Sequence, residues 1–240
     1  MYAINPGENI NLSVRCLQNV SENDILMPLT KDGIETALGN YNNLLNTKFI
    51  GKWELIGQGI LRSDGSKALY IAPTAIPERN PSEIAVTLKS GGKSIGVLIS
   101  KIYVSPLGIS VQADGNEWKT FPYAGVNNNG PINNIVGQDG NNSIRLSWKG
   151  KMYGMFKWSL QDVTCAYILN GGTQLYQHIY GNGLVSDGEI SIEPPSEFIQ
   201  TGTTLGTFKV KSSGNIDLRD PAHSSYKTGK LRGVIRLESN

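Results

Sequence analysis

The chain has 240 residues, and its 22 Lys and Arg residues against 20 Asp and Glu residues give a formal net charge of +2. This balance, without a long basic run, excludes the charge pattern of a nucleic-acid-binding protein, so no nucleic acid is expected as a partner. No apolar run approaches the ~20 residues of a transmembrane helix, so no membrane span is expected. The 28 glycines and the short asparagine runs between Val, Ile, Thr and Tyr instead predict many short strands and turns.

The first part of the chain predicts one strand and one segment that can be interpreted in two ways. Residues 1–8 are expected to be a lead-in with a turn at Pro6-Gly7, and Ile10–Leu17 alternates as the first strand. Four apolar residues then recur at helical spacing and favour a short amphipathic helix: Ile34, Leu38, Tyr41 and Leu45. Gly39 and the neighbouring asparagines favour an ordered loop instead, and both interpretations stay open.

Residues 49–88 contain the most readable strand signals. Trp53 and Leu55 alternate with polar neighbours, as in a strand with one face on a core. The pair Asp64-Gly65 predicts a tight hairpin turn, with Ala68–Ile71 as the returning strand. Three prolines then interrupt the ladder, and alternation resumes after Glu83. Residues 94–104 are expected to form a long closing strand.

Several strings in this region resemble a known family. They are W-E-L-x-G-x-G from Trp53, A-L-Y-I-A-P, N-P-S-E-I-A-V, and upstream Val14-Arg15-Cys16 with N-D-I-L-M-P-L. Over residues 5–104 the chain resembles the immunoglobulin-like modules repeated in bacterial cell-surface proteins and lipoproteins. The resemblance implies an Ig-like β-sandwich with Trp53 between its two sheets. It names a scaffold that carries many functions.

A domain boundary is predicted at Ser105–Gly108, which divides the chain into residues 1–105 and 106–240. The second half predicts an asparagine-rich loop at 125–130 and strands at 109–113, 117–123, 144–148, 152–160, 163–169, 173–180, 184–192, 205–211 and 230–237. The predicted fold class is all-β, with two tandem antiparallel β-sandwich domains, of which the second is a sandwich or flattened barrel. The ends of this half also resemble uncharacterised β-modules of bacterial lipoproteins, through the strings V-Q-A-D-G-N-E-W, L-G-T-F-K-V and G-K-L-R-G.

The residue types of known catalytic sites are present, but not in the required patterns. His178 and His223 lack the G-x-S-x-G context of a Ser-His site and the paired spacing of a zinc site. Cys16 and Cys165 sit in alternating strands of different halves, which favours two buried thiols over a disulfide. We expect no enzyme activity, no catalytic residue, no cofactor and no metal.

The acidic and amide side chains do not match the patterns of a catalytic or calcium-binding site either. The carboxylates Asp187, Glu189, Glu193 and Glu197 fit the solvated face of a strand better than a glycosidase pair. Asp139, Asn141 and Asn142 lack the spacing of a calcium loop.

Three aromatic residues are the remaining candidates for ligand binding: Trp118, Phe121 and Tyr123. Exposed rings beside the asparagine-rich loop could stack on a sugar, while ordinary hairpin packing is the simpler interpretation.

The sequence therefore favours a non-enzymatic structural or adhesive interaction protein of a bacterial surface or extracellular assembly. Its partner would be another protein or further copies of itself, and its export signal would have been removed. The alternatives are a subunit of a phage-tail-like particle or filament, assembled from the cytoplasm, and a glycan-binding module. Strands 94–104 and 230–237 are expected at sheet edges, where another chain could add a strand.

Overall fold

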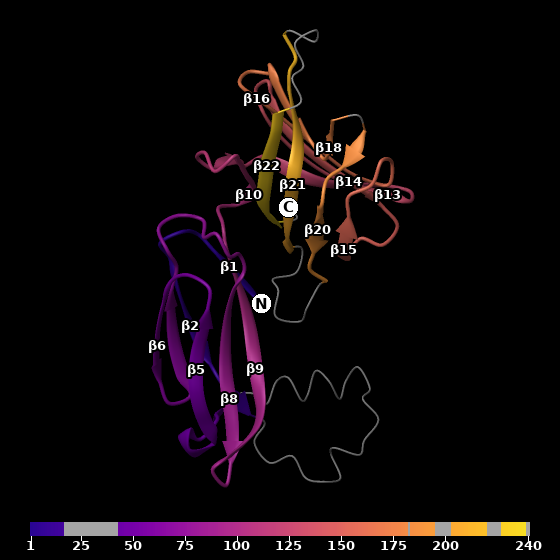
Figure 1. Ribbon diagram of the computed structural model, residues 1–240. Coiled ribbons are helices and arrows are strands. Elements are labelled where there is room, and N and C mark those ends of the chain that lie inside the picture. Colours follow the sequence, from indigo (N-terminus) through magenta and orange to yellow (C-terminus); the bar gives the residue numbers. More distant parts are fainter. Residues whose placement is uncertain (17–42, 182, 195–202, 220–226, 239–240) are drawn as a thin grey trace. The chain divides into compact units, whose positions relative to one another are not determined.

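The computed structural model describes residues 1–16, 43–181, 183–194, 203–219 and 227–238 (Figure 1). Within these residues every regular element is a β-strand, apart from the short 3-10 turn η1 (Thr47–Phe49). The all-β prediction is confirmed. The chain divides into two compact units, Gly7–Ile102 and Met1–Pro6 with Tyr103–Asn240, called the smaller and the larger unit. Residues 1–6 thus join the larger unit; whether the units fold independently stays a prediction.

The smaller unit contains two three-stranded antiparallel sheets and a short ladder. One sheet has the order β2-β7-β6, with β2 (Asn9–Ser13), β6 (Ile60–Asp64) and β7 (Lys67–Ile71). The other contains β9-β8-β5, with β5 (Ile50–Ile56), β8 (Ser82–Ser90) and β9 (Lys93–Val104). β3 (Arg15–Cys16) pairs with β4 (Asn43–Leu44). β1 (Tyr2–Ile4) extends the second sheet on the β9 side.

Local signals explain the first hairpin. Asp64 pairs with Lys67, so the loop is only Gly65-Ser66, and Gly65 has a φ of 57°, which favours glycine. The predicted hairpin is confirmed. The predicted helix or loop before η1 falls outside the described residues up to position 42, and Asn43–Leu44 is a short strand.

Two side chains connect the sheets of the smaller unit. Tyr70 on β7 is fully buried, and its hydroxyl donates to the carbonyl of Gln58 at 2.7 Å and lies 3.2 Å from Ser82 Oγ on β8. Trp53 is half-buried against a cluster that includes Val86, and its indole N–H donates to the Gly65 carbonyl at 2.9 Å. Both rings therefore hold β6 and β7 to the facing sheet.

The larger unit is built on one large antiparallel sheet. Its strand order is β11-β10-β22-β21-β17-β16-β14-β13-β12, and β15 pairs with β20, which pairs with β21. The strands are β10 (Gly108–Ala113), β11 (Lys119–Phe121), β12 (Ala124–Asn129), β13 (Ile132–Asp139), β14 (Asn142–Lys149), β15 (Gly154–Lys157), β16 (Val163–Leu169), β17 (Gln174–Gln177), β20 (Gly188–Ile192), β21 (Thr203–Asp217) and β22 (Lys227–Glu238). β18 (Ile179–Tyr180) and β19 (Leu184–Val185) form a separate pair.

This sheet rolls up until its two ends nearly meet. The end strands β11 and β12 are consecutive in the chain, and the Phe121 side chain on β11 packs on Gly137 of β13. Lys119 of β11 also forms an ion pair with Asp139 of β13. The sheet is therefore a nearly closed, barrel-like layer. The sequence predicts a sandwich of two facing sheets or a flattened barrel for this half.

One apolar interior fills the rolled sheet. Fully buried Ile109, Trp148, Ile190 and Ile235 come from strands far apart in the sequence and belong to the same core cluster. Trp148 stacks on the partly buried Phe156, with ring centroids 5.9 Å apart. Burying such rings is the main stabilising contribution to this unit.

Three predictions for this half, and the prediction of a lead-in at residues 1–8, are wrong. Residues 125–130 were expected to be a loop, but they lie mainly in β12, which pairs with β13 across the two-residue loop Gly130-Pro131. The strand predicted at 205–211 does not end at Lys211: β21 continues to Asp217, past an irregularity between Val210 and Ser213. In both cases cross-strand pairing overrides a weak local preference. Residues 230–237 are not at an edge, because β22 lies between β10 and β21. Residues 1–8 contain β1.

We predict that Gly233→Ala destabilises the larger unit by about 1–3 kcal/mol. Gly233 lies opposite Phe208 in the β21–β22 ladder, and a Cβ there would overlap the Phe208 ring. Gly125→Ala on β12 is the matched control, because nothing lies within 4 Å of its would-be Cβ. Urea unfolding should separate the two variants, and equal midpoints would contradict this packing.

We predict that Trp53→Ala lowers the unfolding free energy of the smaller unit by about 3 kcal/mol, since the half-buried ring loses its packing and its hydrogen bond. Trp53→Phe retains the apolar contact and should cost about 1 kcal/mol. If the units unfold separately, the calorimetric transition of the larger unit stays unchanged in both variants. One transition that moves as a whole would contradict separate unfolding.

Candidate functional site

A hollow lies on the outer face of the β2-β7-β6 sheet. Leu12, Ala68 and Tyr70 alternate inward in these strands and are buried. Their neighbours therefore face outward and form two cross-strand rows, Asn11-Leu69-Arg62 and Ser13-Lys67-Asp64.

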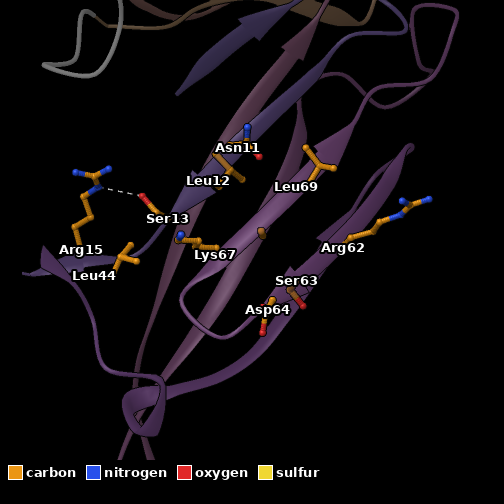
Figure 2. A pocket seen from close by; sticks show the side chains of 11 residues that line it. Asn11, Leu12, Ser13, Arg15, Leu44, Arg62, Ser63, Asp64, Lys67 and Leu69 are labelled. Atoms are coloured by element: carbon orange, nitrogen blue, oxygen red, sulfur yellow. Dashed lines mark hydrogen bonds between the residues drawn. The ribbon is translucent and has the colours of Figure 1, made fainter. Parts of the chain in front are cut away.

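The hollow is open, and its volume is about 700 Å³. Arg15 and Leu44 of the β3–β4 ladder border one end, and Arg15 Nε donates to Ser13 Oγ at 3.1 Å. Figure 2 shows the guanidinium groups of Arg15 and Arg62 on opposite sides of the hollow. Its charged groups therefore do not converge on one point.

The hollow carries a net positive charge, and its charged side chains are exposed to solvent. Arg15, Arg62 and Lys67 outnumber Asp64, and none of these four forms an ion pair within 4 Å with any described residue. An exposed charge pair contributes roughly 0–1 kcal/mol. Three such contacts give at most about 3 kcal/mol, which corresponds to a dissociation constant weaker than about 1 mM. The hollow can attract an anion, but it does not form a strong site.

The three predicted aromatic candidates do not share a surface. Phe121 is fully buried, and its ring meets Tyr167 edge-on at 6.1 Å. Trp118 is half-buried, with the Arg232 guanidinium 5.2 Å from its ring centre. Tyr123 is 88% exposed. Trp118 and Tyr123 remain candidates for stacking on a ligand, whereas the Phe121 ring belongs to the core.

The described histidine and cysteine are structural. His178 is buried at the break between β17 and β18; its Nδ1 accepts from the Cys165 N–H at 3.1 Å, and Nε2 lies 2.9 Å from the Ser159 carbonyl, to which it donates. Cys165 is buried and free, as predicted, and burial raises the pKa of its thiol, which disfavours the reactive thiolate. His223 and the side chain of Cys16 lie outside the described residues.

Of the four candidate carboxylates, Asp187 is exposed, but the next two along the chain are only partly solvated. Glu189 and Glu193 are half-buried, and Glu193 Oε1 accepts from the Tyr103 hydroxyl at 2.7 Å. Burial, and then the neighbouring Glu193 carboxylate, raise the pKa of Tyr103. Glu197 lies outside the described residues. No group of three or more His, Cys, Asp or Glu suited to a metal occurs in the described part of the chain.

Strand β9 presents the most unusual surface. Ile95, Val97, Leu98 and Ile99, called the β9 apolar segment, are 65%, 53%, 48% and 61% exposed. The sequence predicts that residues 94–104 form a strand, but it does not predict the exposure of these side chains. The continuous run Val97-Leu98-Ile99 was the available signal, because a one-sided strand rarely carries apolar residues on both faces.

Comparison with known proteins identifies no family: no protein-family model, curated protein or solved structure matches this chain. Among the described residues, no helix is long and apolar enough to cross a membrane.

We predict that small anions bind the hollow with a dissociation constant weaker than about 1 mM and are displaced by about 0.5 M NaCl, because its cations are exposed and screened. An NMR titration with sulfate, monitored through the backbone amide resonances of Arg62 and Lys67, measures this dissociation constant. Lys67→Glu should abolish the shifts, and Lys157→Glu, in the larger unit, should leave them unchanged. Micromolar binding would mean that the hollow is a functional site.

Proposed function

We propose that this chain is a non-enzymatic structural or adhesive interaction protein of a bacterial surface or extracellular assembly, with a protein as its partner. The observation that carries the proposal is the β9 apolar segment. Solvent-exposed apolar groups that lie together on one strand mark interaction surfaces, because their burial against a partner is favourable.

The smaller unit supports the Ig-like part of the proposal. Trp53 of β5 packs against a cluster of Val14, Ile50 and Val86, and the Tyr70 hydroxyl on β7 lies 3.2 Å from Ser82 Oγ on β8, so side chains connect the two sheets. The resemblance to bacterial surface modules expects the tryptophan between two sheets. We propose that this unit is a reduced Ig-like sandwich.

Two alternatives retain specific support. A subunit of a phage-tail-like particle or filament would use the same β9 apolar segment to contact further copies of the chain. A glycan-binding module would use the 88% exposed Tyr123 or the half-buried Trp118. Loss of glycan-array binding in Tyr123→Ala would favour the second alternative.

The main proposal predicts a partner at β9. A photo-crosslinking amino acid at position 97, in the full chain in its native cells, should give an adduct with another protein. The matched control is position 62, which is exposed on the outer face of the other sheet. An adduct with the mass of two copies would favour the filament alternative. Equal adducts at positions 97 and 62 would contradict both the main proposal and the filament alternative.

A further inference from the structure

In the part of the chain that the structure describes, no strand lies beside the outer edge of the first part of β9. β8 pairs with β9 on one side, from Ser90↔Lys93 to Ser82↔Ile102. On the other side, the only strand among the described residues is the three-residue β1, whose Ile4 carbonyl accepts from the N–H of Ser105, just past the end of β9 (Figure 1). Within the described chain, Lys93–Ile99 therefore have no strand neighbour on that side. Unpaired backbone groups of this kind can hydrogen-bond an added strand.

The side chains of this edge suit an apolar strand. Val97 and Ile99 lie opposite Thr87 and Ala85, while Leu98 lies opposite Val86 on the other face. Gly96 has nothing within 4 Å of its would-be Cβ, so a bulky side chain of a neighbouring strand has room there. An added strand with alternating apolar residues would place them beside Val97 and Ile99 on one face, and its other side chains would lie on the face of Leu98.

The charged side chains around the β8–β9 turn are all positive. Residues 88–101 contain Lys89, Lys93 and Lys101 and no Asp or Glu. Lys101 lies opposite Glu83 in the ladder, whereas Lys89 and Lys93 form no ion pair within the described residues. A second β9 would place its own lysines against these, and like charges that face each other across strands are destabilising.

We propose that the β9 edge takes up an extended strand of a different protein, with alternating apolar side chains and acidic residues at the end beside Lys89 and Lys93. This partner chemistry deepens the proposed function and rests on it. The backbone of β9 would bind the strand through ladder hydrogen bonds, the β9 apolar segment would bind its apolar side chains, and the two lysines would select its acidic end.

Three synthetic peptides test the proposal with the full chain: E-E-T-V-T-V-T-V-E-E, the same core between lysine pairs, and the acidic peptide with proline at two core positions. By fluorescence anisotropy, the acidic peptide should bind at least tenfold more tightly than the lysine peptide. The proline peptide should not bind, since it cannot complete a ladder. The variant Lys89→Glu/Lys93→Glu should reverse the preference between the charged peptides.

Circular dichroism shows whether the double variant is folded. Lys151→Glu/Lys157→Glu, which changes two exposed lysines of the larger unit, is the matched control that should keep the original preference. Equal binding of the acidic and lysine peptides, or binding of the proline peptide, would overturn the proposal. So would a dimer in sedimentation velocity that Val97→Lys abolishes, because the occupant would then be a second copy. A crosslinked partner at position 97 without charge preference overturns only this inference, whereas no crosslink there overturns the proposed function itself.

Discussion

The larger unit depends on one long ladder, in which β21 pairs with β22 from Thr203↔Glu238 to Asn215↔Lys227. β22 carries β10 on its other side, and β21 carries two different strands. Gly206–Val210 pairs with β20, and Gly214–Asp217 pairs with β17. The irregularity between Val210 and Ser213 lies where the partner changes. A bulge bends and twists a strand locally, so the sheet can fork here and still surround one core.

Small residues let this sheet curl over its aromatic rings. The Phe208 ring lies on the backbone of Gly233, and the Phe121 side chain lies on Gly137. At both sites a side chain in place of glycine would hold the ring away from the adjacent strand. Glycine inside a strand usually weakens it, but here the close approach of ring and backbone offsets that cost.

The sequence predicts most of the fold where local signals and pairing agree. The hairpin at Gly65 has both a turn residue and alternating strands, and Asp114-Gly115 follows β10 with positive φ at both positions, as the predicted turn requires. Prediction fails where a segment becomes a strand only because it pairs with a neighbouring strand. β12 is rich in asparagine, which has a low β-propensity, and its pairing with β13 supplies what the propensity lacks. The order of strands, and thus the rolling of the sheet, depends on contacts distant in sequence.

The candidate sites likewise depend partly on local sequence, which can be predicted, and partly on contacts between distant segments, which cannot. Alternation correctly makes residues 94–104 a strand, but exposure depends on how many strands lie beside it, and that is a property of topology. In the larger unit the end strands β11 and β12 approach each other, so rolling up limits its open edges. Among the described residues of the smaller unit there is no such closure, and no strand lies beside the first part of β9 on the side away from β8. Lysines near an edge usually discourage unselective pairing. An apolar edge strand with lysines at one end therefore combines attraction for apolar strands with selection against most of them, as expected of a specific docking edge.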